Sequence, residues 1–119
     1  MPAVRVAMAQ INPTVGDLAG NSAKILDAAK RAHSQGAQIV LFPELALTGY
    51  PIEDLALSRD FLDASEKALQ GIATSADQIG IGELTLVVGY PGFSDQPSSW
   101  AIGALSLIHI SEPTRLLSI

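Results

Sequence analysis

The sequence contains no cysteine among its 119 residues. This absence excludes a disulfide framework, thiolate metal sites and a cysteine nucleophile within these residues. The sequence also lacks an apolar run of the roughly 20 residues that a membrane helix needs. Its start, Met1 to Val6, has no basic region followed by an apolar stretch, as a secretory signal would. We therefore expect a cytoplasmic protein that is not inserted in a membrane.

Charged residues are also scarce. They make up 16% of the sequence, against roughly 25% in average soluble proteins, so part of the surface is expected to be covered by something else. The formal net charge of -5 and the lack of clustered Lys and Arg argue against nucleic acid or an anionic membrane as a partner, because both are bound chiefly through grouped cations. A hydrophobic content of 48% is enough for the core of one small domain.

Strand patterns mark two segments in the first half of the sequence. Val4, Val6 and Met8 alternate with smaller or polar residues, which predicts a strand ending near Gln10. Residues 38–42 hold a continuous apolar run, which predicts a second strand covered on both faces, as in a parallel sheet.

An amphipathic helix of about four turns is predicted between these strands. Asn21 or Ser22 can cap it, and Gly36 is placed to end it. The residues at helical spacing along its apolar face are Ile25, Leu26, Ala29, Ala32 and His33. His33, near the end of the helix, is expected to pack or to interact with the helix dipole. Strand, helix and covered strand together predict a βαβ unit and an α/β fold.

The second half of the sequence continues the pattern. A helix is expected from about Phe61 to Ala76, capped by Asp60, with an apolar face of Leu62, Leu69, Ile72 and Ala76. Residues 84–88 predict a third strand, and residues 100–107 predict a fourth after a surface loop. The segment at residues 80–82 lacks the following helix and third glycine of a dinucleotide fingerprint, and is interpreted as a loop.

The stretch from Phe42 to Pro51 begins where the covered strand ends, and it carries Glu44. In open parallel sheets, ligands bind just beyond the carboxyl ends of the strands, which makes Glu44 a candidate general base. The large apolar side chains beside it would partly desolvate its carboxylate and so favour proton uptake. On the pattern alone, an ordinary loop glutamate that pairs with a surface cation or caps the next turn is the alternative.

Several segments occur together in an order typical of one family. They are residues 8–17, Gly20-Asn21, residues 42–51 and Glu53-Asp54-Leu55. With them, the sequence resembles the opening of the nitrilase, or carbon–nitrogen hydrolase, superfamily, over about residues 4–105. The segments Asn-Pro-Thr-Val-Gly-Asp and Gly-Tyr-Pro-x-Glu-Asp-Leu favour the glutaminase domain of glutamine-dependent NAD+ synthetases within that superfamily.

The resemblance implies a fold and a mechanism. The fold is an α-β-β-α sandwich, of which this chain would supply the first strands and two outer helices. The mechanism is amide hydrolysis by a Glu, Lys and Cys triad, in which the glutamate takes the thiol proton, the cysteine attacks and the lysine stabilises the oxyanion. Glu44 matches the catalytic glutamate. Tyr50 matches an aromatic residue beside the glutamine pocket, with a packed loop tyrosine as the alternative. Glu53 and Asp54 fit either a polar site entrance or a solvated turn.

The other two triad members are missing. By the resemblance they would follow the strand that ends at residues 89–91, and the sequence has no cysteine there or elsewhere. Lys24, Lys30 and Lys67 precede that point and fall in predicted helices, so none of them is assigned the lysine role. We therefore expect the chain by itself to be inactive.

The parent protein, on this resemblance, hydrolyses glutamine and passes the ammonia to a second domain. There a nicotinate dinucleotide activated with ATP and magnesium accepts it to give NAD+. The chain itself is expected to hold no cofactor and no metal, and the parent is expected to be a homo-oligomer. Two alternatives stay open: a stand-alone amidase or carbamoylase of the same superfamily, and a non-catalytic α/β module that binds a partner through exposed sheet surface.

The last residues depart from the family. Residues 105–115 resemble the conceptual translation of a transposase-based sequencing adapter. We therefore expect residues 1–104 to be the amino-terminal part of a carbon–nitrogen hydrolase domain and residues 105–119 to be a non-native tail, with a genuine strand as the alternative. His109 has no second His, Cys or paired carboxylate nearby at metal-binding spacing, and is not assigned as a ligand.

Overall fold

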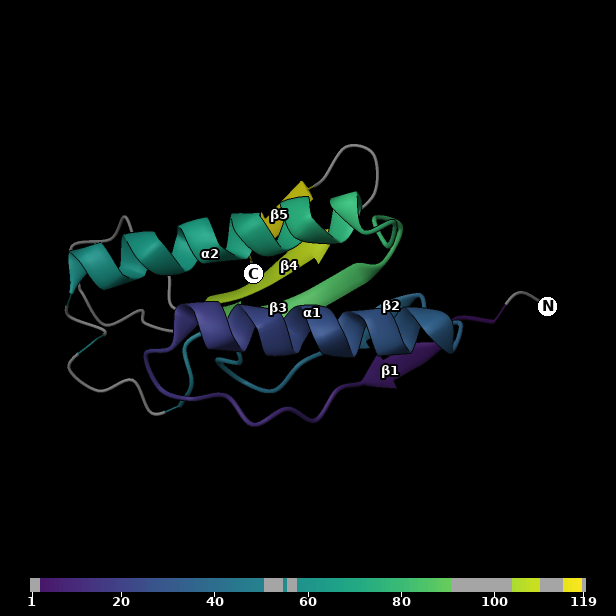
Figure 1. Ribbon diagram of the computed structural model, residues 1–119, viewed down its shortest axis with the longest axis horizontal. Coiled ribbons are helices and arrows are strands. Elements are labelled where there is room, and N and C mark those ends of the chain that lie inside the picture. The colour runs from purple at the N-terminus through teal and green to yellow at the C-terminus, as the bar shows by residue number, and fades with distance from the viewer. Residues whose placement is uncertain (1–2, 51–54, 56–57, 91–103, 110–114, 119) are drawn as a thin grey trace.

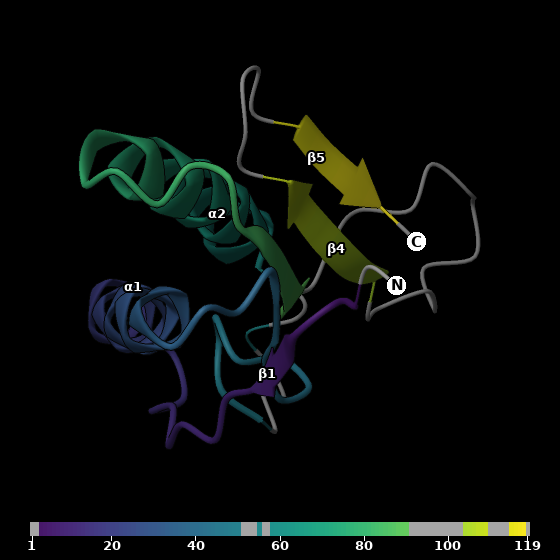
Figure 2. The ribbon, with the colours of Figure 1, turned by 90° about the vertical axis from the view of Figure 1, so that its right-hand side faces the viewer.

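A computed structural model describes residues 3–50, 55, 58–90, 104–109 and 115–118. Five strands form one sheet in the order β1-β2-β3-β4-β5, and two helices accompany it. Both helices lie on the same side of the sheet and pack against each other (Figures 1 and 2). The α/β fold expected from the sequence is confirmed.

The first three strands form the parallel part of the sheet. They are β1 (Val6–Met8), β2 (Ile39–Leu41) and β3 (Thr85–Tyr90). β2 lies between β1 and β3, and both pairings are parallel. Each parallel connection contains a helix, because parallel neighbours need a long crossover. The predicted βαβ unit is confirmed, and the loop predicted at residues 80–82 does lie between the second helix and β3.

Helix α1 (Leu18–Ser34) begins earlier than predicted. Asp17 is its N-cap, and one carboxylate oxygen of Asp17 accepts a hydrogen bond from Gly20 N at 2.9 Å. The prediction that Asn21 or Ser22 caps the helix is therefore wrong. Gly36, with φ +85°, follows the last turn as expected, because glycine adopts this left-handed conformation readily. The predicted apolar face is confirmed: Ile25, Ala29 and Ala32 are buried, and Leu26 and His33 are partly buried.

Helix α2 (Arg59–Gln78) is longer than predicted at both ends. Its cap is Ser58, whose Oγ accepts a hydrogen bond from Phe61 N at 3.2 Å. The prediction of an Asp60 cap is wrong, since Asp60 lies in the first turn, where its charge faces the positive end of the helix dipole. The predicted apolar face is confirmed, because all four of its residues are buried: Leu62, Leu69, Ile72 and Ala76.

In β1 and β2, one face of the sheet is covered and the other is largely exposed. Val40 in β2 is 0% exposed, whereas the next residue, Leu41, is 37% exposed. In β1, Val6 and Met8 are 46% and 77% exposed, while Ala7 between them packs against the core. Successive strand residues point to opposite faces, and both helices lie on one of them. The expectation that residues 38–42 are covered on both faces is therefore wrong in this chain.

Two antiparallel strands complete the sheet. β4 (Ala104–His109) pairs with β3, and β5 (Arg115–Ser118) pairs with β4. The fourth strand predicted at residues 100–107 overlaps β4, and residues 100–103 lie outside the described part of the chain. β5 was not predicted. The surface loop expected before residue 100 lies outside the described residues too.

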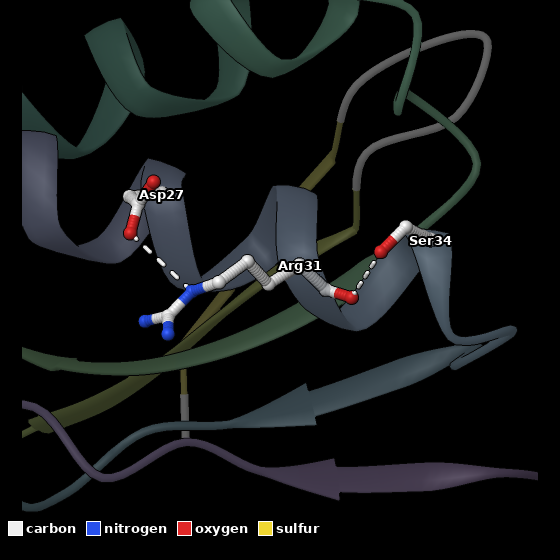
Figure 3. Close-up of polar contacts among 3 residues, drawn as sticks. All are labelled: Asp27, Arg31 and Ser34. Carbon is white, nitrogen blue, oxygen red and sulfur yellow. Dashed lines mark hydrogen bonds and ion pairs between the residues drawn. The ribbon is translucent and has the colours of Figure 1, made fainter.

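The exposed side of α1 carries an ion pair one helical turn apart. Arg31 Nε lies 3.3 Å from Asp27 Oδ2, and Ser34 Oγ donates a hydrogen bond to Arg31 O at 2.7 Å (Figure 3). Both charged side chains are more than two-thirds exposed. Exposed pairs of this kind contribute about 0.3–0.5 kcal/mol, so α1 is held mainly by its buried face. Among the described residues, no helix has the length and apolar character needed to cross a membrane.

Candidate active site

Glu44 lies just beyond the carboxyl end of β2. The hydrogen bonds of the sheet continue to this point, since Ala9 N donates to Leu41 O at 2.8 Å and Phe42 N donates to Val87 O at 3.1 Å. Because β1, β2 and β3 are parallel, their carboxyl ends share one edge of the sheet. Glu44 therefore occupies the edge where open α/β sheets bind ligands, as the sequence predicted.

A tight turn over residues 44–48 carries Glu44. Ala46 N donates to Pro43 O at 3.2 Å, and Gly49 N donates to Leu45 O at 2.8 Å. Leu45 has φ 50°, a left-handed conformation that costs a non-glycine residue on the order of 1–3 kcal/mol. Leu45 is 7% exposed, and Leu47 is fully buried. Burial of these apolar side chains holds the backbone in a conformation that a free loop would avoid.

The Glu44 side chain is exposed, although the five residues after it are buried. The expectation that apolar neighbours desolvate the carboxylate is therefore wrong in this chain. The reason is the turn, which buries the residues from Leu45 onward and leaves Glu44 at the surface. Among the described residues, no ion pair or hydrogen bond engages the Glu44 carboxylate, so neither contact expected of an ordinary loop glutamate is found there.

Tyr50 ends this segment and is 67% exposed. It is not the packed loop tyrosine that was the alternative to a place beside a substrate pocket. The position of Tyr50 beside a glutamine pocket stays a prediction. Glu53 and Asp54 lie outside the described residues.

The other candidate groups are positioned elsewhere. Lys24 and Lys30 lie in α1 and Lys67 lies in α2, as predicted. Lys24 Nζ donates to Asn12 O at 2.6 Å, and the other two lysines are exposed. The described part of the chain contains no group of three or more side chains that could hold a metal ion.

A surface hollow formed by described residues lies at the opposite edge of the sheet. It encloses about 510 Å³ and is lined by residues that precede β2 and β3, among them His33, Gln38 and Glu83. His33, in the last turn of α1, lies 3.2 Å from Glu83 through Nε2 and Oε1. A smaller hollow of about 210 Å³ lies between β1 and α1. Neither of these two hollows is lined by Glu44.

Comparison with known proteins identifies the family. The model of the carbon-nitrogen hydrolase family matches residues 5–113. The chain belongs to this family. Glu44 lies well inside the matched range, and so does every helix of the fold.

Synthetases and amidases are among the similar proteins. A glutamine-dependent NAD(+) synthetase of Thermotoga maritima is 41% identical over 90 residues, which cover 76% of this chain and 15% of the relative. The crystal structure of such a synthetase from Cytophaga hutchinsonii matches with TM-score 0.76 and 27% identity, over 90% of this chain and 17% of that one.

A third similar protein is an amidase from Nesterenkonia. It matches with TM-score 0.70 and 28% identity, over 94% of this chain and 42% of that one, and its structure shows acrylamide added at its active site cysteine. The nitrilase-type fold implied by the sequence is thus confirmed. The chain spans less than a fifth of the length of the synthetases that it matches.

One residue that contacts the Glu44 turn was missed by sequence reasoning. Asn21 was interpreted as a possible helix cap, but it lies inside α1 and its side chain is fully buried. Asparagine is unfavourable inside a helix because its carboxamide competes for backbone hydrogen bonds. That cost, once α1 is known to begin at Leu18, is the signal that Asn21 has another role.

Proposed function

We propose that this chain is the amino-terminal part of the glutaminase domain of a glutamine-hydrolysing NAD+ synthetase, with Glu44 as its general base. The observation that carries the proposal is the position of Glu44 on a constrained turn at the carboxyl edge of the parallel sheet. The 41% identity to a glutamine-dependent NAD(+) synthetase supports the choice of substrate.

The proposed chemistry needs a thiol and a cation from outside these residues, because the chain has no cysteine. Glu44 takes the proton of the thiol, and the thiolate attacks the amide carbon of glutamine. The lysine stabilises the oxyanion that forms, and ammonia leaves with a proton returned by Glu44. Water then hydrolyses the thioester and releases glutamate. The exposure of Glu44 leaves its carboxylate accessible to groups that other segments supply.

Tyr50 has a place in this scheme. It lies six residues after Glu44 and its side chain is 67% exposed. An exposed aromatic ring near a general base is suited to cover the aliphatic part of a glutamine side chain. We therefore assign Tyr50 to substrate binding.

The remaining steps belong to the longer protein. There the ammonia reaches a second domain that uses ATP and magnesium to convert deamido-NAD+ to NAD+, and the longer protein is a cytoplasmic homo-oligomer. The name of the similar synthetases supports the formation of NAD+, and the complex of one such synthetase with adenosine diphosphate supports the use of ATP.

Expression of two forms of the protein tests the proposed function. The 119-residue chain is expected to release no ammonia from glutamine, because a base without its nucleophile has nothing to activate. The longer protein encoded by the intact gene is expected to release ammonia and to form NAD+ when ATP is added. Ammonia release by the short chain that is lost on Glu44→Gln contradicts the scheme, and so does a longer protein without glutaminase activity.

The proposal extends to the tail. We propose that residues 105–119 are non-native, because residues 105–115 resemble a translated adapter. A genuine strand is the competing explanation, since the family match runs to residue 113 and β4 pairs with β3. Resequencing the gene past the Ala104 codon separates the two. Recovery of a lysine loop and a later cysteine supports the proposal, and a stop codon directly after Ile119 contradicts it.

The exposed apolar side chains at and just before β1 predict that the 119-residue chain self-associates. Val4, Val6 and Met8 are between 46% and 77% exposed, and apolar surface of this kind is buried by association. Sedimentation velocity is expected to show self-association that Val6→Lys with Met8→Lys reduces. The matched control, Ala64→Lys with Gln70→Lys on the exposed side of α2, adds the same charge and is expected to leave it unchanged.

A stand-alone amidase is the second candidate function. The likeness to the Nesterenkonia amidase favours it, because this chain covers 42% of that protein. It would share Glu44 and lack the synthetase domain, so the downstream gene sequence distinguishes the two. A non-catalytic binding module is the third candidate. A monomeric 119-residue chain that melts cooperatively would favour it.

A further inference from the structure

Asn21 is a buried polar side chain in the first turns of α1, with an exposed fraction of 0%. Its Oδ1 accepts a hydrogen bond from Thr14 N at 2.8 Å. Its Nδ2 donates to Thr14 O at 2.8 Å and to Leu47 O at 2.9 Å. Both N–H groups and one acceptor site of the carboxamide are therefore engaged. The side chain links helix α1 to two separate loops.

These loops are the segment before α1 and the turn that carries Glu44, and their backbones touch. Gly16 N donates to Thr48 O at 2.8 Å. Gly49 lies so close to Val15 that a Cβ atom on it would be 2.7 Å from Val15 Cα. Only glycine permits this approach. Thr48 and Gly49 are thus held against the segment before α1, and Leu47 is held by Asn21 of α1.

The anchored residues are connected directly to the position next to Glu44. Gly49 N donates to Leu45 O at 2.8 Å, and Leu45 has the left-handed φ of 50°. A non-glycine residue keeps such a conformation only where its surroundings enforce it. The path from the Asn21 carboxamide to Glu44 is therefore short: it runs through Leu47 to Gly49 along the chain, and from Gly49 N to the carbonyl of Leu45, which is next to the glutamate.

We propose that Asn21 is a positioning residue for the general base Glu44. Its carboxamide fixes the far side of the turn, which keeps Leu45 in its left-handed conformation and sets where the Glu44 carboxylate points. Asn21 is fully buried and acts only through the turn. The inference rests on the proposed function, because it presumes that Glu44 accepts a proton during catalysis.

The test uses the longer protein and measures glutamine hydrolysis together with thermal unfolding. Asn21→Ala removes all three hydrogen bonds. The expected result is a fall in kcat on the order of 10²-fold with little change in KM, because a small misplacement of a catalytic group slows chemistry without weakening substrate binding. Asn21→Ser is the milder variant, to be used if the alanine variant does not fold.

Two controls separate positioning from stability. Ser22→Ala alters the neighbouring residue, whose buried Oγ has no hydrogen-bond partner, and is expected to leave kcat and stability unchanged. Leu69→Ala destabilises the core away from the turn, and is expected to lower the unfolding temperature while kcat of the folded enzyme stays unchanged.

The results distinguish a failure of the proposed function from a failure of the positioning role of Asn21. An unsubstituted longer protein without glutaminase activity overturns the proposed function, and this inference with it. An active protein in which Asn21→Ala keeps its kcat, or raises KM alone, overturns the inference and leaves the proposed function standing. The inference is also overturned if Leu69→Ala lowers kcat as much, or if neither Asn21 variant folds, because Asn21 would then only support the fold.

Discussion

The two edges of the parallel sheet are built differently. At the carboxyl edge, the Glu44 turn is tied to a neighbouring segment by the buried Asn21 side chain and by backbones in direct contact. At the amino edge, residues before β2 and β3 surround an open hollow of about 510 Å³, with exposed polar groups across it. The edge that carries the candidate base is the closely packed one. The candidate base thus lies on a backbone that its neighbours constrain.

The two edges also differ in the contacts of an exposed glutamate at each. Glu83 at the amino edge has a partner in His33, at 3.2 Å. Glu44 has no partner among the described residues. The turn that carries it is nevertheless held by backbone hydrogen bonds. A carboxylate left without a partner on a constrained backbone is available for a proton or a substrate, whereas Glu83 is already engaged.

The sharpest test of the contrast is a pair of glycines, one at each edge. Gly49 has φ +80°, and a Cβ on it would meet the backbone of Val15 at 2.7 Å. Gly49→Ala is therefore expected to lower the free energy of unfolding by about 3 kcal/mol, from backbone strain and from overpacking. Urea unfolding of the 119-residue chain measures this change in the free energy of unfolding. If Gly49→Ala lowered the free energy of unfolding by less than Gly36→Ala does, the two edges would not differ as described.

Gly36 at the amino edge has nearly the same conformation, with φ +85°, but different surroundings. A Cβ there would meet only the end of the Arg5 side chain, at 3.2 Å, which can move. Gly36→Ala is expected to cost about 1 kcal/mol, from the left-handed backbone alone. The same urea titration measures this loss, and equal losses at Gly36 and Gly49 would show that the edges are equally tight.

A glycine away from both edges is the reference. Gly71 lies inside α2, and a Cβ on it would have no atom within 4 Å. Gly71→Ala is expected to raise the free energy of unfolding by about 0.5–1 kcal/mol, because alanine loses less conformational entropy in a helix. A destabilised Gly71→Ala variant would mean that glycine substitutions do not report local packing in this chain.

The smallest effect is expected at the exposed pair of the amino edge. The side chains of His33 and Glu83 are 35% and 79% exposed. Exposed pairs are screened by solvent, so Glu83→Gln is expected to change the free energy of unfolding by less than about 0.5 kcal/mol. A loss comparable to that of Gly49→Ala would show that the amino edge is also tightly held.

The sequence predicted the parts of the fold that depend on periodicity. The buried faces of both helices, such as Ile25 in α1 and Leu69 in α2, follow from helical spacing alone. The parallel order of the first three strands follows from the alternation of strands and helices. Glu44 was placed at a strand end because the end of an apolar run is visible in the sequence.

The parts that failed depend on tertiary contacts. Asn21 and Asp17 are both good capping residues, and only the packing of two loops shows that Asp17 caps α1 while Asn21 is buried. A continuous apolar run shows that both faces of a strand are apolar but not whether this chain covers both, which is why Leu41 was wrongly expected to be covered. The left-handed Leu45 and the exposure of Glu44 follow from the turn, which leaves no periodic signal.

The central claim is that Glu44 is the base of a glutaminase. Its most direct test is ammonia release from glutamine by the longer protein carrying Glu44→Gln, beside the same protein carrying Glu83→Gln. We predict that Glu44→Gln lowers kcat by on the order of 10²–10⁴-fold with unfolding unchanged, while Glu83→Gln keeps the full rate. Full activity of the Glu44→Gln protein, or an equal loss in both variants, would contradict the account.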